Sequence, residues 1–153
     1  MVERVRGVLI TESGRALLIK RIRPGMAPYW VLPGGHVDPD DDGLEAALSR
    51  EIREELAVEI EVVSLVHIEQ SEDERQFFYL GRIDHWSFAD RSGPEFSEEG
   101  RGEYILEEVP LTLEALSMID LKPSQIAPFV RDAIANGGFF SLPDLRESNL
   151  RQN

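Results

Sequence analysis

A helix that carries acidic side chains on its apolar face constrains this chain more than any other feature. Aliphatic residues recur at every fourth position within residues 43–57, which predicts an amphipathic helix. They are Leu44, Leu48, Ile52 and Leu56. At about 100° per residue, Glu51, Glu54 and Glu55 fall on an arc that overlaps this apolar stripe. A solvated charge run would lie on the opposite arc, so we interpret the three glutamates as a functional group.

The glutamates also need a compensating charge. Carboxylates at helical spacing repel one another, which destabilises a helix unless something offsets the repulsion. A hard divalent cation does so because it takes oxygen ligands. The turn at Gly34 and Gly35, upstream of the run at residues 50–55, can expose backbone oxygens as well. The pattern therefore predicts a divalent-metal site.

Residues 38–43 offer a competing interpretation, because acids alternate there and a glycine follows, as at the start of a calcium-binding EF-hand loop. The twelfth position of such a loop should be a bidentate glutamate, but Ser49 stands there. The preceding segment reads as strand and turn, whereas an EF-hand needs an entering helix. We therefore do not assign an EF-hand.

The segment from Gly35 to Val58 resembles the Nudix box, whose pattern is Gly-x5-Glu-x7-Arg-Glu-U-x-Glu-Glu-x-Gly-U with U an aliphatic residue. The run at residues 50–55 fits the second half without a gap, and Val58 fits the closing aliphatic position. The chain departs from the pattern in its loop, where six residues instead of five separate Gly35 from Asp42, and where Asp42 replaces a glutamate. Ala57 replaces the late glycine.

The resemblance implies a hydrolase that cleaves the pyrophosphate bond of a nucleoside diphosphate derivative with Mg²⁺ or Mn²⁺. A nucleoside triphosphate, a sugar nucleotide or a dinucleotide would each be such a substrate. The implied catalytic residues are Arg50, Glu51, Glu54 and Glu55. The implied metal ligands are Glu51, Glu54, Glu55, the Gly35 carbonyl oxygen and, through water, Asp42, with Asp38 and Asp41 as alternatives to Asp42. Arg50 would hold a helix carboxylate in place.

Two parts of the site stay open at this level. The general base could be a box glutamate or an acid from a distant loop. The loop candidates are Glu72, Glu74, Glu98 and Glu99. Basic and aromatic residues on or beside the expected sheet are candidates for binding phosphate and base. They are Arg6, Arg21, Arg23, Tyr29 and Arg75.

The alternation of strand and helix patterns predicts the fold class. Strands are expected at residues 5–11, 15–21, 29–32, 59–69, 76–84 and 103–109, and helices at residues 43–57, 111–117 and 123–136. This is a mixed α/β order, and the resemblance implies an α/β/α sandwich with a mixed sheet between helices. We expect one Nudix domain over residues 1–142, a loosely held polar tail over residues 143–153, and a long connection over residues 85–102.

Composition narrows the partners. A net charge of −13 disfavours duplex nucleic acid, which needs a field of basic residues, yet a bound cation can reverse the local field for a small phosphorylated nucleotide. No apolar run predicts a membrane span and no leader is evident at the start, so the cytoplasm is the expected location. The absence of cysteine disfavours a diphosphate isomerase of the same fold. A non-catalytic nucleotide sensor is the alternative function, and a homodimer is left open.

Overall fold

A mixed, curled sheet forms the centre of the molecule. The computed structural model describes residues 1–86 and 103–147. Within them the strands are β1 (Val2–Ile10), β2 (Ala16–Ile22), β3 (Tyr29–Val31), β4 (Gly34–His36), β5 (Glu61–Gln70), β6 (Glu74–Arg82), β7 (Glu103–Val109) and β8 (Leu121–Lys122). Their order is β5-β6-β1-β2-β3-β8, with β4 paired to β1 and β7 paired to β2. The β1–β6 and β3–β8 pairs are parallel, and the other pairs are antiparallel.

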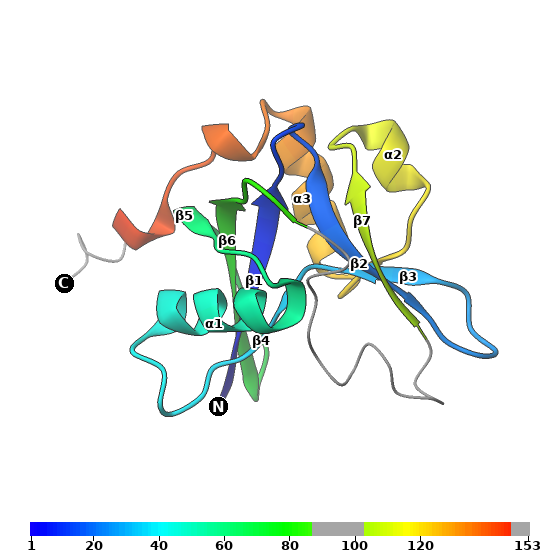
Figure 1. Cartoon of the computed structure of the whole chain (residues 1–153). Coiled ribbons are helices and arrows are strands. Elements are labelled where there is room, and N and C mark those ends of the chain that lie inside the picture. The colour runs from blue at the N-terminus through cyan, green and yellow to red at the C-terminus, as the bar shows by residue number, and fades with distance from the viewer. Residues whose placement is uncertain (87–102, 148–153) are drawn as a thin grey trace.

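Helices cover both faces of this sheet (Figure 1). One face packs against α1 (Leu44–Leu56), and the other against α2 (Leu113–Ser117) and α3 (Ile126–Ala135). Strand β1 shows why both faces are buried: Val5 and Leu9 contribute to the core under α1, whereas Val8 contributes to the core under α3. The sandwich expected from the resemblance is therefore confirmed.

Two short strands were not predicted. Strand β4 pairs with β1 in the register Val5↔Gly35, although its two glycines read as a turn in the sequence. Strand β8 is only two residues long and pairs with β3. Both strands exist because a neighbouring strand supplies their hydrogen bonds, and that is information a local pattern does not carry. The longer predicted elements are all present, with bounds shifted by a few residues.

Helix α1 ends at an alanine in an unusual conformation. Ala57 has φ 56 and ψ 35, in the left-handed region, and its N–H donates to the Arg53 carbonyl oxygen. Glycine adopts this conformation without a Cβ penalty and is the commonest residue at such a helix end. The position is the one where the Nudix pattern has glycine, so Ala57 keeps the geometry of the pattern at a cost in stability.

The start of the expected tail is held in place, contrary to the prediction. Asp144 accepts a hydrogen bond from the Leu65 N–H, and Arg146 donates to the Val63 carbonyl oxygen. The segment is polar in sequence, but these polar groups bind the backbone of β5. Residues 148–153 lie outside the described part of the chain, as do residues 87–102 of the expected long connection. Among the described residues, no helix is long and apolar enough to cross a membrane.

Candidate active site

The acidic face of helix α1 packs against β4, the strand that contains Gly34 and Gly35. Leu48 and Ile52 are fully buried and fix the helix on the sheet. In this orientation Glu55 accepts a hydrogen bond of 2.9 Å from the Gly34 N–H. The carboxylate of Glu51 lies against Gly35, where an added Cβ would come within 2.5 Å of its Cδ. Glycine at position 35 is therefore what gives the Glu51 carboxylate its room.

Glu51 is more buried than the neighbouring Glu54, and this burial affects its pKa. Its side chain is 17% exposed, whereas that of Glu54 is 60% exposed. Desolvation raises the pKa of Glu51, and the nearby Arg50 charge opposes that rise. A partly buried carboxylate beside other acids gains strongly from a positive ligand. Positive charge next to Glu51, such as that of Arg50, therefore stabilises its ionised form.

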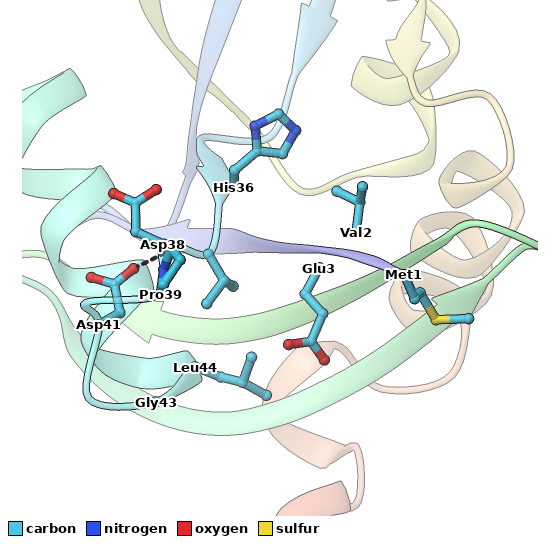
Figure 2. A pocket seen from close by; sticks show the side chains of 10 residues that line it. Met1, Val2, Glu3, His36, Asp38, Pro39, Asp41, Gly43 and Leu44 are labelled. Atoms are coloured by element: carbon cyan, nitrogen blue, oxygen red, sulfur yellow. Dashed lines mark hydrogen bonds between the residues drawn. The ribbon is translucent and has the colours of Figure 1, made fainter.

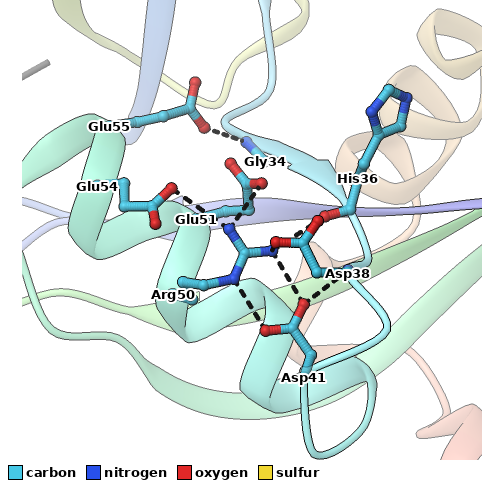
Figure 3. Close-up of polar contacts among 8 residues, drawn as sticks. All are labelled: Gly34, His36, Asp38, Asp41, Arg50, Glu51, Glu54 and Glu55. Atoms are coloured by element: carbon cyan, nitrogen blue, oxygen red, sulfur yellow. Dashed lines mark hydrogen bonds and ion pairs between the residues drawn. The ribbon is translucent and has the colours of Figure 1, made fainter.

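Arg50 organises the loop and the helix around these acids (Figure 3). Its Nε and Nη2 donate to the two carboxylate oxygens of Asp41 at 2.8 and 2.9 Å. Its Nη1 lies 3.2 Å from Glu51 Oε1 and 3.3 Å from Glu54 Oε2. Its Nη2 also donates to the His36 carbonyl oxygen at 3.1 Å. One guanidinium therefore links the loop, the end of β4 and two helix carboxylates.

Asp41 is the loop acid that faces this network. Its side chain is 7% exposed, and it accepts a further hydrogen bond from the Asp38 N–H. The paired Arg50 guanidinium lowers the pKa of Asp41 to about 2. Asp42, which the spacing places in the slot of the first box glutamate, is exposed and has no hydrogen-bond or ion-pair partner among the described residues. The extra loop residue thus brings Asp41 inward and leaves Asp42 outside.

The expected metal ligands fit a hard cation in chemistry, although each of the three helix glutamates already has a partner. Among residues 1–86 and 103–147, no three acidic or histidine side chains converge into a complete metal cluster. Glu51 and Glu54 face Arg50, and Glu55 faces the Gly34 N–H. The donor set is entirely oxygen, as Mg²⁺ prefers. Because Gly35 has no side chain, the Glu51 carboxylate can lie directly beside β4. The three glutamates and the Gly35 carbonyl oxygen could therefore hold such an ion.

Arg6 is the predicted substrate-binding residue whose charge interacts with these glutamates. It extends from β1, where it is paired with Gly34, and donates to the Leu32 carbonyl oxygen at 3.1 Å and to Gln76 at 3.3 Å. Burial lowers the pKa of Arg6, while the charges of Glu55 and Glu51 are close enough to oppose that effect. A fixed guanidinium beside the acidic face is suited to a phosphate oxygen.

Arg21 and Tyr29 lie side by side on neighbouring strands, in the register Arg21↔Tyr29. The sequence did not reveal their third neighbour, Tyr104, which pairs with Arg21 from the other side. The guanidinium of Arg21 lies 3.7 Å from the Tyr104 ring centroid. Its Nε is buried without a hydrogen-bond partner among the described residues. This row therefore combines a cation with two aromatic rings.

The other predicted residues are spread out. Arg23 is exposed in the loop between β2 and β3, and Arg75 donates to Gln70 at the start of β6. No described contact joins either residue to the helix glutamates. Of the candidate bases, Glu72 is exposed, Glu74 pairs with Arg4 at 2.8 Å, and Glu98 and Glu99 lie outside the described residues.

A groove of about 690 Å³ lies beside the loop that connects β4 to α1 (Figure 2). Asp38 and Asp41 contribute to its wall, together with Met1, Glu3 and His36. None of the three helix glutamates lines it. The groove is therefore separate from the acidic face of α1, and we place the candidate site on that face.

Comparison with known proteins agrees with this architecture. A protein of Bacillus subtilis (strain 168), whose name suggests an 8-oxo-dGTP diphosphatase, is 36% identical over 75 residues. That match spans 47% of this chain and 48% of the relative, so the chain matches about half the length of this curated relative.

Solved structures match over more of the chain. The MutT NUDIX hydrolase of Burkholderia pseudomallei has a TM-score of 0.55 and 29% identity, with 82% of this chain and 94% of that chain covered. A MutT structure from a study of Aliivibrio salmonicida and Vibrio cholerae has a TM-score of 0.60 and 20% identity, with 88% and 97% covered, and shows a shared fold. The family model described as NUDIX domain matches residues 1–133. The chain therefore belongs to the Nudix family.

Proposed function

We propose that this protein is a metal-dependent pyrophosphohydrolase that cleaves the diphosphate linkage of a small nucleoside diphosphate derivative. The observation that carries the proposal is the Glu51 carboxylate. It is largely buried, its pKa is raised by desolvation, and it lies against a glycine that leaves it room. A carboxylate in such a place is costly to the fold, and a bound cation offsets that cost.

We assign cation binding to Glu51, Glu54, Glu55 and the Gly35 carbonyl oxygen, with Mg²⁺ or Mn²⁺ as the ion. In such a site a divalent ion neutralises phosphate charge and makes water a better nucleophile. Arg50 holds Glu51 and Glu54 from one side, while its bidentate contact with Asp41 fixes its own position. This leaves the orientation of the helix carboxylates to a rigid guanidinium.

The general base is one of two kinds. A box glutamate is one candidate, because Glu51, Glu54 and Glu55 lie together on the acidic face of α1. A loop acid remains the other alternative, and Glu74 is less suited because it is already paired with Arg4. Replacing each candidate by glutamine and comparing pH–rate profiles distinguishes the two.

Substrate binding is assigned to two groups of residues. Arg6 lies beside the helix glutamates and is suited to a phosphate oxygen. Arg21, Tyr29 and Tyr104 form a row on neighbouring strands, and its aromatic rings and guanidinium are suited to stacking with a planar ring. Arg23 and Arg75 are secondary candidates, since Arg23 is exposed in a loop and Arg75 is half-buried and already donates to Gln70.

The first substrate to test is 8-oxo-dGTP, because the Bacillus subtilis relative bears that substrate in its name. A panel with Mg²⁺ should also contain unmodified nucleoside triphosphates, ADP-ribose, sugar nucleotides and dinucleotides, with the products identified. Hydrolysis of at least one of them at the diphosphate linkage is the expected result. Silence across the whole panel, with binding of a nucleotide retained, would support the sensor alternative instead.

A further inference from the structure

The segment at residues 144–146 closes an edge of the sheet. Strand β5 stands at one end of the strand order and, among the described residues, pairs only with β6. An edge strand presents unpaired backbone N–H and C=O groups, which another chain can use for pairing. In Figure 1 the C-terminal segment runs past β5. It is thus placed to occupy that edge.

Two side chains of the segment bind the backbone of the edge strand. Asp144 Oδ1 accepts from the Leu65 N–H at 3.1 Å, and Arg146 Nη2 donates to the Val63 carbonyl oxygen at 2.8 Å. These are the N–H and the C=O that a single residue on a parallel neighbouring strand would engage. Val63 also lies at an irregularity of the β5–β6 pairing, between the register pairs of Val62 and Ser64. Such an irregularity leaves backbone groups without a ladder partner.

The segment is itself held rigidly. Arg146 forms a two-point contact with Asp144, with Nε–Oδ1 at 3.0 Å and Nη2–Oδ2 at 2.7 Å. Its Nη1 reaches Glu45 in the first turn of α1 at 3.0 Å. Leu145, between them, packs on the core under α1. Two charged groups and one apolar side chain thus fix the segment to both β5 and α1.

We propose that residues 144–146 form a clasp that imitates a neighbouring strand, and that this clasp prevents β5 from pairing with β5 of a second copy of the chain. The clasp and an added strand compete for the same two backbone groups, so only one of them can occupy the edge. Opening the clasp turns β5 into a self-association surface. This inference does not depend on the enzymatic activity.

The full-length double variant Asp144→Ala/Arg146→Ala tests the clasp. Its matched control is Arg53→Ala/Glu59→Ala, which removes an exposed acid–arginine pair between α1 and the residues just before β5, and which leaves the net charge the same. No described hydrogen bond joins this pair to Val63 or Leu65. Light scattering over a wide concentration range should show the mass of the double variant rising above that of the wild type, about twofold at the high end. The control should keep the wild-type mass.

Amide hydrogen exchange at Leu65 identifies the surface. In the dilute double variant this amide should exchange at least about tenfold faster than in the wild type, and its protection should return as concentration rises. Wild-type mass at all concentrations, or association without renewed protection of Leu65, overturns the proposal. If the double variant does not fold, the wild type still decides, because a Leu65 amide that exchanges there like a free edge amide contradicts the clasp.

Discussion

Asp41 and Arg50 form a two-point ion pair, with the carboxylate oxygens of Asp41 2.8 and 2.9 Å from Nε and Nη2 of Arg50. The pair joins the loop before α1 to the helix that carries the candidate metal ligands. It leaves Nη1 of Arg50 to face Glu51 and Glu54. The geometry of the acidic face therefore depends on an aspartate in the loop.

This arrangement predicts different effects for two adjacent aspartates. Asp41→Ala removes the anchor of Arg50 and should lower kcat by about 10- to 100-fold, as loss of a group that orients metal ligands commonly does. Asp42→Ala, one position away on an exposed side chain, is the matched control and should stay within about twofold of the wild type. Steady-state kinetics with Mg²⁺ measures both. A larger loss for Asp42→Ala would give the role to Asp42, and equal losses would contradict a role for Asp41 alone.

The two glycines of β4 predict a second contrast. Gly35→Ala places a Cβ 2.5 Å from the Glu51 Cδ, so the carboxylate must move and activity should fall sharply while the fold survives. Gly34 has a backbone φ of +150, and a Cβ added there would collide with the Val5 carbonyl oxygen. Gly34→Ala should therefore lower the stability of the fold. Thermal melts and activity of both variants test this. A fully active Gly35→Ala enzyme would mean that the position of Glu51 is not critical.

The left-handed alanine at the end of α1 predicts a gain in stability. Ala57→Gly relieves a Cβ that is disfavoured at φ 56, and it should raise the free energy of unfolding by about 1 kcal/mol. Ala46→Gly, at an exposed position inside the same helix, should lower it by about 1 kcal/mol because glycine is a poor helix former. Urea unfolding measures both changes. Two losses of the same size would contradict the assigned conformation of Ala57.

The clasp residue Asp144 predicts a pH-dependent contribution to stability. Hydrogen bonds from Arg146 lower the pKa of Asp144 to about 2 from its ordinary value of 3.8. The folded state therefore binds the proton less tightly than the unfolded state, so the stabilisation is complete above about pH 4 and disappears as the pH falls towards 2. Urea unfolding of the wild type and Asp144→Ala should differ by about 1 to 2 kcal/mol at neutral pH, because water screens part of the pair, and should converge in acid. A difference that is independent of pH would exclude this ion pair as its source.

Helix α1 could be predicted because its pattern is local. Leu48 and Ile52 lie on one stripe by their spacing alone, and the same spacing places the acids beside that stripe and so indicates a site. Strand β4 could not be predicted, because Gly34 and Gly35 have no β preference and pair only through β1.

The details of the site depended on tertiary contacts for the same reason. Counting along the box cannot tell which residue of a longer loop turns inward, and the structure turns Asp41 in where the count placed Asp42. Tyr104 was missed because only the β2–β7 register brings it beside Arg21, and these two strands are far apart in the sequence. Residues 144–146 resemble a free tail in sequence because the backbone groups they bind are on another strand.

The most direct test of the proposed function is the Mg²⁺ dependence of pyrophosphate-bond hydrolysis in the wild type, Glu54→Gln and Glu55→Gln. The exposed Glu59, next to α1, supplies the control Glu59→Gln. We predict wild-type and control turnover that requires Mg²⁺, with both other variants folded and slower by at least about 100-fold. Turnover without a divalent cation, or wild-type rates from Glu54→Gln and Glu55→Gln, would contradict the account.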